Sequence, residues 1–312
     1  MKMCVGGEWV DTGKRIEVIH PFDGSVVDTV PVARAEDVER ALERAVEGAR
    51  VMARMPAWER AQVLRRTADS IEREAEQWAR TITLEEGKPI QEARVEVARA
   101  VETLRLSAEE ARRIHGETVP LDAVPTGVGR FGFTLRVPCG VVVAISPFNF
   151  PLNLVVHKVG PALAGGNAVG FKPASATPLT ALLLCEVLLE AGVPPEALSC
   201  LTGPGEMLGR FLASDRRVRK ISFTGSVEVG NAICRAAGAK KVTMELGGNA
   251  PIVVMPDADL ALVAKAVRAS GFANAGQVCI SAQRILVTSA NAGSLIDALR
   301  PEIGAIRTGN PK

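Results

Sequence analysis

From Val137 onward, short apolar segments alternate with helical segments, and this alternation restricts the fold more than any other feature. Four segments typical of buried strands, GVVVAIS, NAVGFKP, LSCLTG and KISFTGS, are each followed by a stretch of helical character. Such alternation predicts right-handed βαβ units and a mostly parallel, doubly wound sheet. Ligands of these sheets bind at the loops after the strand carboxyl ends, so those four loops are the first candidate sites.

The first third of the chain is predicted to be helical after a short extended start. Apolar residues recur at helical spacing over 35–52, a second helix begins at Pro56 and includes Trp78, and a third runs from Pro89 to His115. These helices carry no clustered chemistry, which predicts a packing role. After Lys240 the alternation restarts with KVTMEL, PIVVM, a helix and RILV, and a second α/β layer is expected to begin there.

Composition restricts the class of protein. The 312 residues carry 37 basic and 35 acidic side chains, so the net charge of +2 gives no electrostatic basis for binding nucleic acid or an anionic membrane. Six cysteines without a CxxC pair indicate neither a zinc site nor a disulfide framework, and no metal site is predicted. The N-terminus lacks the apolar core of a signal peptide, and we expect a cytoplasmic protein.

Polar groups follow the first two of these strands. SPFNFP holds Asn149 between two prolines, and a rigid amide donor is what an oxyanion hole requires, although a Pro-rich turn needs no such role. In GFKPAS, Lys172 directly follows a strand, where an ammonium could meet a phosphate or a ribose hydroxyl, or simply face solvent.

Glycine turns follow the next two strands. GPGEMLG has the spacing GxGxxxG rather than GxGxxG and is weak evidence of a dinucleotide loop. FTGS places Gly225 before a helix whose N-terminal amides could meet a pyrophosphate. Two such turns make nucleotide binding plausible without proving it.

Two further motifs could carry chemistry. MELGGN puts Glu245 at the end of an apolar strand, where partial desolvation would raise its pKa and suit it to general-base work; a surface glutamate capping a turn is the alternative. FANAGQVCIS places Cys279 among small residues before an apolar strand. A reactive thiol must be accessible, whereas most cysteines are small buried apolar residues, and we expect that for the other five.

The order of these motifs carries more information than any one of them. PFNFP, GFKPAS, GPGEMLG, FTGS, ELGGNAP and GQVCIS follow one another as in the aldehyde dehydrogenase superfamily, which the chain resembles over essentially its whole length. The resemblance implies that Cys279 attacks the aldehyde carbon and that Asn149, with the Cys279 backbone N–H, forms the oxyanion hole. It implies that Glu245 activates the water that hydrolyses the thioester, and that Lys158 lies near the relay around the nucleophile.

The resemblance also implies a site for NADP or NAD. Many NAD-preferring members carry Glu at the position of Ser175, so a neutral Ser beside Lys172 predicts that NADP is accepted. The presence of Glu245 favours water over coenzyme A as acyl acceptor, and the cofactor-site sequence is most similar to lactaldehyde, glycolaldehyde and non-phosphorylating glyceraldehyde-3-phosphate dehydrogenases. The residues expected to line the cofactor site are Ile145, Ser146, Pro147, Phe148, Lys172, Ser175, Gly205, Gly209, Phe223, Thr224, Gly225, Ser226, Val229, Leu246 and Gly247.

The family pattern divides the chain into parts. Residues 1–125 and 140–244 are expected to form the dinucleotide-binding domain, 126–139 an extended segment of the oligomerisation type, and 245–312 a partial catalytic domain with the nucleophile. Full-length members continue through a Glu-x-Phe-Gly-Pro motif and form homo-dimers or tetramers, so the chain is expected to be an N-terminal portion with apolar surface exposed. The alternatives are a catalytically silent NAD(P)-binding module or pseudoenzyme, and cofactor-independent ester hydrolysis by the same thiol.

Overall fold

A seven-stranded sheet forms the centre of the molecule, in the order β11-β10-β7-β8-β9-β1-β2. The computed structural model describes all residues from Met1 to Lys312. The five strands from β11 to β9 are parallel, and β1 and β2 extend the sheet in antiparallel pairs. Its strands are β1 (Met3–Val5), β2 (Glu8–Val10), β7 (Val141–Ile145), β8 (Ala168–Lys172), β9 (Leu198–Cys200), β10 (Val218–Thr224) and β11 (Lys241–Glu245). The predicted doubly wound sheet is therefore confirmed.

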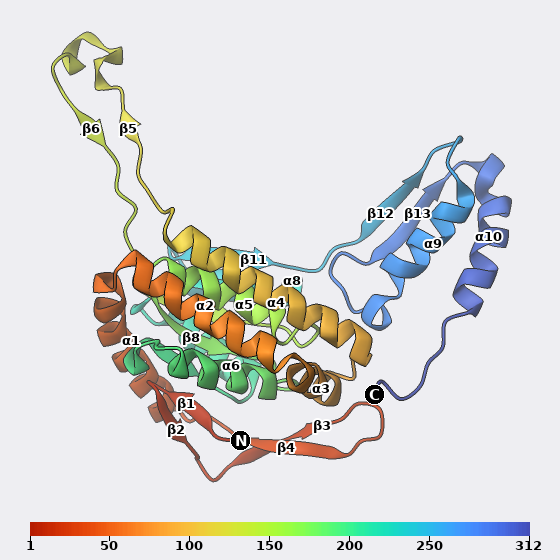
Figure 1. Ribbon diagram of the computed structural model, residues 1–312, viewed down its shortest axis with the longest axis horizontal. Helices are drawn as coiled ribbons and strands as arrows, with labels where there is room; N and C mark the ends of the chain where they lie inside the picture. Colours follow the sequence, from red (N-terminus) through yellow and green to blue (C-terminus); the bar gives the residue numbers. More distant parts are fainter.

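Helices cover both faces of this sheet (Figure 1). On one face, α5 and α6 pack on the strands, with α2, α3 and α4 outside them; α1, α7 and α8 pack on the other face. These helices are α1 (Ala35–Arg54), α2 (Ala57–Arg73), α3 (Ala75–Glu86), α4 (Ile90–Ala111), α5 (Asn153–Ala164), α6 (Leu179–Glu190), α7 (Gly205–Ser214) and α8 (Val227–Ala237). None of the helices combines the length and apolar character that crossing a bilayer requires.

Two sequence-based boundaries were wrong. The helix expected from Pro56 through Trp78 is two helices, because Glu74 leaves the helical region (φ −110°, ψ 23°) and ends α2 before α3 begins. The strand over KVTMEL does not open a second layer, because β11 pairs in parallel with β10 as the edge of the main sheet. In both cases the apolar pattern continues across a point where the segment changes the element it packs against. The pattern alone does not indicate that point.

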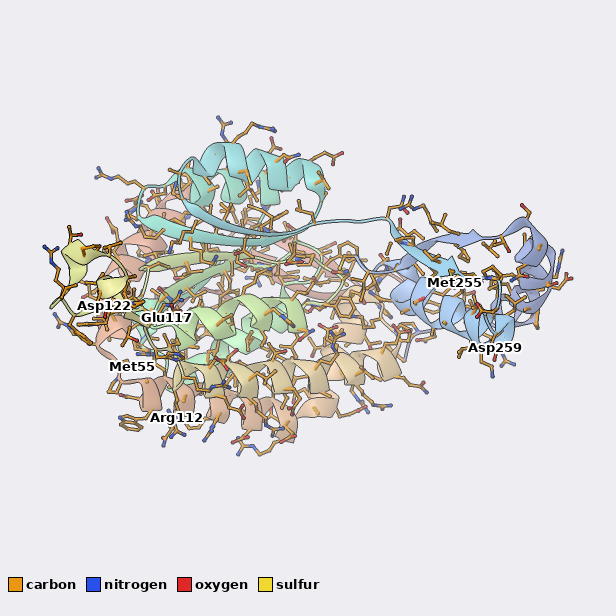
Figure 2. The ribbon with its side chains drawn as sticks, turned by 90° about the horizontal axis from the view of Figure 1, so that it is seen from above. Met55, Arg112, Glu117, Asp122, Met255 and Asp259 are labelled. Atoms are coloured by element: carbon orange, nitrogen blue, oxygen red, sulfur yellow. The ribbon has the colours of Figure 1, made fainter.

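A smaller α/β unit follows β11 and lies apart from the helical body (Figures 1 and 2). Its two parallel strands are β12 (Ala250–Val254) and β13 (Ala282–Val287), with α9 (Leu260–Gly271) and α10 (Ser289–Gly304) beside them. The main hydrophobic core stops at Ala237, and the buried apolar side chains of this unit are not part of it. The unit therefore has a small core of its own.

Two hairpins complete the structure. β3 (Arg15–Ile19) pairs with β4 (Val26–Pro31), and β5 (Thr118–Val119) pairs with β6 (Gly132–Phe133). The second hairpin, with short 3-10 turns at its tip, forms an arm that projects from the body, and the predicted extended segment 126–139 lies largely within it (Figure 1). Along this arm Val128, Phe131 and Leu135 are exposed. Its part in assembly stays a prediction.

Candidate active site

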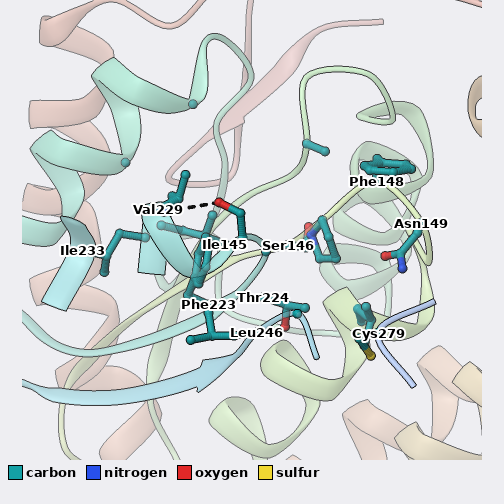
Figure 3. Close-up of a pocket in the computed structure, with 18 of the residues that line it drawn as sticks. Ile145, Ser146, Phe148, Asn149, Phe223, Thr224, Val229, Ile233, Leu246 and Cys279 are labelled. Carbon is teal, nitrogen blue, oxygen red and sulfur yellow. Dashed lines mark hydrogen bonds between the residues drawn. The ribbon is translucent and has the colours of Figure 1, made fainter. Parts of the chain in front are cut away.

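A cavity of about 1230 Å³ opens where the strand order of the main sheet reverses (Figure 3). The chain runs outward from β7 through β8 to β9 and then returns to place β10 on the other side of β7. The loops after β7 and β10 therefore diverge to opposite faces and leave a crevice at the carboxyl ends, which is the usual ligand position in such sheets. Ser146 and Gly225, from these two loops, both line the cavity.

All residues that the sequence analysis assigned to a dinucleotide line this one cavity. The helices α7 and α8 begin at its wall, so their unpaired N-terminal amides are available to an anionic group. A Cβ added at Gly209 or Gly247 would meet no atom within 4 Å, so the backbone at both positions faces open space that a ligand could approach closely. Helix N-termini and open glycine backbone along one wall are features that can hold the phosphates of a nucleotide.

The sequence analysis missed several lining residues. On α8 the apolar side chains Ala232, Ile233 and Ala236 continue the face that begins with Val229, at a spacing that could have identified it. Two arginines and a glutamate on α7 and α8 gave no motif that could have identified them. The other missed residues are Leu154, Ala174, Glu206, Arg210, Arg235, Gly248, Gly276, Gln277, Val278 and Gln283.

Cys279 and Asn149 lie at the opposite end of the cavity from Val229 and Ile233 (Figure 3). Cys279 is the exposed cysteine of the chain; Cys4, Cys185 and Cys200 are buried and the other two are half-buried. The Asn149 side chain donates a hydrogen bond from Nδ2 to the backbone carbonyl of Gln277, 2.7 Å away and two residues before the thiol. A primary amide has a second N–H, and this N–H of Asn149, a residue that lines the cavity, makes no hydrogen bond in the structure.

Glu245 and Lys158 do not line the cavity. Glu245 lies at the end of β11, which is the edge strand of the sheet. Its side chain is exposed to solvent, so the burial that the sequence analysis expected for its carboxylate is absent. Lys158 is buried beneath the cavity wall and donates a hydrogen bond of 2.6 Å from Nζ to the hydroxyl of Thr224, which does line the cavity. Burial lowers the pKa of the Lys158 ammonium to about 8, with the charge of Glu245 opposing the shift.

The lowered pKa of Lys158 makes folding stability depend on pH. Between pH 8 and the ordinary lysine value of 10.5, the unfolded chain binds a proton that the folded chain has lost. In that window this lysine makes the free energy of unfolding rise with pH, by up to about 1.4 kcal/mol per unit. Denaturant unfolding from pH 7.5 to 10.5 should show a smaller rise in Lys158→Met, with the part due to Lys172 remaining because its pKa is also lowered to about 8. Lys265→Met, at an exposed lysine, should retain the full rise. An identical slope in Lys158→Met and the unsubstituted protein would contradict the assignment.

Comparison with known proteins agrees with this geometry. Residues 9–312 match the aldehyde dehydrogenase family. The chain belongs to this family. It is 43% identical over 309 residues to the 3-sulfolactaldehyde dehydrogenase of Priestia aryabhattai, and the match covers 99% of this chain and 64% of that relative. It is 46% identical over 296 residues to aspartate-semialdehyde dehydrogenase 1 of Pseudomonas canavaninivorans, and this match covers 95% of this chain and 63% of that relative.

A solved structure supports both the family and the fold. The NADP-dependent glyceraldehyde-3-phosphate dehydrogenase of Bacillus halodurans C-125, complexed with NADP, superposes with a TM-score of 0.97 at 34% identity. It covers 100% of this chain, which in turn covers 66% of that enzyme. The chain thus spans just under two thirds of the length of the aldehyde dehydrogenases that it matches.

Proposed function

We propose that this chain provides the dinucleotide site and the thiol nucleophile of an NAD(P)-dependent aldehyde dehydrogenase, which oxidises a small aldehyde to a carboxylate. The observation that carries the proposal is the shared cavity: the glycine turns at the N-termini of α7 and α8 and the exposed thiol of Cys279 line one continuous space. A nucleotide long enough to extend along this wall would bring its reactive end toward the thiol. When bound, the nicotinamide supplies the hydride acceptor.

The residues of this chain would act in a fixed order. The Cys279 thiolate adds to the aldehyde carbon, and the free N–H of Asn149 with the Cys279 backbone N–H stabilises the oxyanion of the tetrahedral adduct. Loss of hydride from that adduct leaves a thioester on Cys279. Glu245, whose side chain lies in solvent outside the cavity, would have to turn toward Cys279 to take a proton from the water that hydrolyses the thioester. Lys158 holds Thr224 in place behind the cavity wall.

The phosphate end of the cavity supports the use of NADP. Ser175 is exposed at the cavity wall and donates a hydrogen bond of 2.9 Å to the Gly203 carbonyl, beside a helix start. Lys172 lines the same space; burial lowers its pKa to about 8, so its ammonium is still charged at neutral pH. Neither side chain repels a 2′-phosphate. In the solved relative named above, NADP is the bound cofactor.

A negative charge at position 175 should weaken the binding of NADP. Ser175→Glu places a carboxylate where a 2′-phosphate would lie, and we expect the affinity for NADP to fall about tenfold to hundredfold while that for NAD changes little. Ser175→Gln is the control of equal size without the charge. Binding is measured by calorimetric titration with both dinucleotides. If Ser175→Glu weakens NAD as much as NADP, or if the unsubstituted protein prefers NAD by a hundredfold, the assignment of Ser175 is wrong.

The arm and the substrate extend the proposal. The exposed apolar side chains of β5–β6 and its flanks, Val128, Phe131 and Leu135 among them, suit burial against a second copy, which supports a homo-dimer or tetramer in solution. The two curated relatives named above act on 3-sulfolactaldehyde and aspartate semialdehyde, which are small aldehydes with an acidic group. We infer a small aldehyde as the substrate of this protein also.

One experiment separates this function from a silent binding module. Purified protein is incubated with NADP or NAD and a panel of short aldehydes, and formation of the reduced dinucleotide is followed at 340 nm, together with binding of each dinucleotide alone. Turnover supports the dehydrogenase. Binding without turnover supports the module, and ester hydrolysis without any dinucleotide supports a simple thiol hydrolase.

A further inference from the structure

The end of α3, the turn after it and the first part of α4 carry charged side chains that are buried beneath the active-site loops. Glu86, Lys88 and Glu96 are all at least 93% buried, and Lys88 Nζ lies 2.5 Å from a carboxylate oxygen of Glu96. A buried ion pair is expensive to desolvate and is a poor source of stability by itself. Such a cluster can serve instead to fix the geometry of neighbouring segments. The other hydrogen bonds of the cluster identify those segments.

The first group fixed by this cluster is the loop that carries Asn149. Lys88 Nζ donates a hydrogen bond of 2.6 Å to the backbone carbonyl of Asn149 and lies 3.9 Å from the centre of the Phe150 ring. The other oxygen of Glu96 accepts hydrogen bonds of 2.9 and 3.1 Å from the backbone amides of Leu152 and Asn153, at the start of α5. One buried ion pair thus holds the main chain on both sides of Pro151, the second proline of this loop.

The second group is the loop that carries Cys279. Asn274 has φ of 49° and Ala275 has φ of 55°. Residues other than glycine rarely adopt this left-handed conformation, so surrounding contacts must stabilise it. The Asn274 side chain is buried and donates a hydrogen bond of 2.8 Å from Nδ2 to Glu86. Its backbone N–H donates a second bond of 2.8 Å to Glu92. Two carboxylates of the α3–α4 region therefore hold the strained residue.

The two loops also meet each other at this point. Asn274 Nδ2 lies 3.3 Å from the Asn149 carbonyl, the same oxygen that accepts from Lys88. On the other side, Asn149 Nδ2 donates to the Gln277 carbonyl, and Gln277 Nε2 donates to the Asn274 carbonyl at 3.2 Å. The hydrogen bonds form a closed ring that includes Asn149 and the residues just before Cys279.

From this ring we propose that Glu86, Lys88 and Glu92 are positioning residues for the nucleophile, acting through Asn274 and Asn149. They touch neither the thiol nor the cavity, and they set the placement of the Cys279 loop relative to the amide of Asn149. The expected catalytic effect rests on the function proposed above, whereas the ordering of the loop does not. Glu86 is the sharpest member to test because one of its carboxylate oxygens, Oε2, has no partner and the other anchors Asn274.

The test combines two substitutions with a matched control. Glu86→Ala removes the acceptor, and Asn274→Gly removes the anchored amide while accepting the positive φ, so it should fold even if the first does not. Glu86→Gln retains a carbonyl acceptor and should restore the loop. Glu85→Gln is the control: Glu85 is the adjacent buried glutamate, but it accepts from Leu179 and Thr180 at the start of α6 and has no contact with the Cys279 loop.

Hydrogen exchange of the segment 272–281 is the primary measurement, because it needs no turnover. We expect Glu86→Ala and Asn274→Gly to exchange about tenfold faster in this segment, with little change elsewhere, because each loses the buried hydrogen bond between Asn274 and Glu86. In an active parent protein, kcat should fall while dinucleotide affinity stays constant. Unchanged exchange in Asn274→Gly, or equally fast exchange in Glu85→Gln, would overturn the proposal. If the parent protein shows no turnover, the function fails while exchange still decides the positioning role.

Discussion

Replacing Cys279 with alanine is expected to reduce aldehyde oxidation by about 10⁵-fold or more, the scale of loss seen when a covalent nucleophile is removed. The cavity offers no second thiol, because none of its other lining residues is a cysteine or a histidine. Dinucleotide affinity should stay within about twofold, because the sulfur lies at the opposite end of the cavity from Val229 and Ile233 of α8 (Figure 3). The measurements are steady-state formation of reduced dinucleotide and titration of the dinucleotide alone.

A second cysteine provides the control for this substitution. Cys234 is half-buried on α8, whose apolar face also lines the cavity, so Cys234→Ala tests whether loss of any thiol in this region has the same result. It should leave turnover within a few-fold of the parent value. Intact-protein mass spectrometry during turnover should find the acyl adduct in Cys234→Ala and not in Cys279→Ala. Turnover of Cys279→Ala within tenfold of the parent would remove the basis of the proposed mechanism.

The position of the site could be predicted from the sequence because its elements are local. A strand, a glycine turn and the start of a helix follow one another within about ten residues, and each is visible as an apolar run followed by small residues. Parallel strands then bring the loops to one edge without further information. The family resemblance then assigns residues as far apart as Ile145, Ser175, Gly209 and Gly247 to one cofactor site, and all of them line the cavity.

What could not be predicted depends on partners distant in the sequence. Glu86 and Asn274 are 188 residues apart, and neither segment contains a sequence pattern that predicts their hydrogen bond. The exposure of Glu245 follows from the place of β11 at the edge of the sheet, a property of strand order rather than of the strand. The break at Glu74 has the same origin, because apolar periodicity shows which side is buried but not where a helix changes direction.

Asn149→Ala is expected to lower kcat/KM for aldehyde oxidation by about 10²- to 10³-fold, the usual cost of losing one oxyanion-hole donor. The substitution removes both the second N–H and the anchor to Gln277, so the comparison is Asn274→Gly, which loosens the same loop and retains the Asn149 amide. Asn149→Asp retains the shape and places an acceptor where the adduct needs a donor; it should be at least as impaired as Asn149→Ala. If the anchor alone mattered, the Asn149 variants would lose no more kcat/KM than Asn274→Gly does. We expect instead that kcat/KM falls further in the Asn149 variants than in Asn274→Gly, because only they remove a group that touches the reacting oxygen.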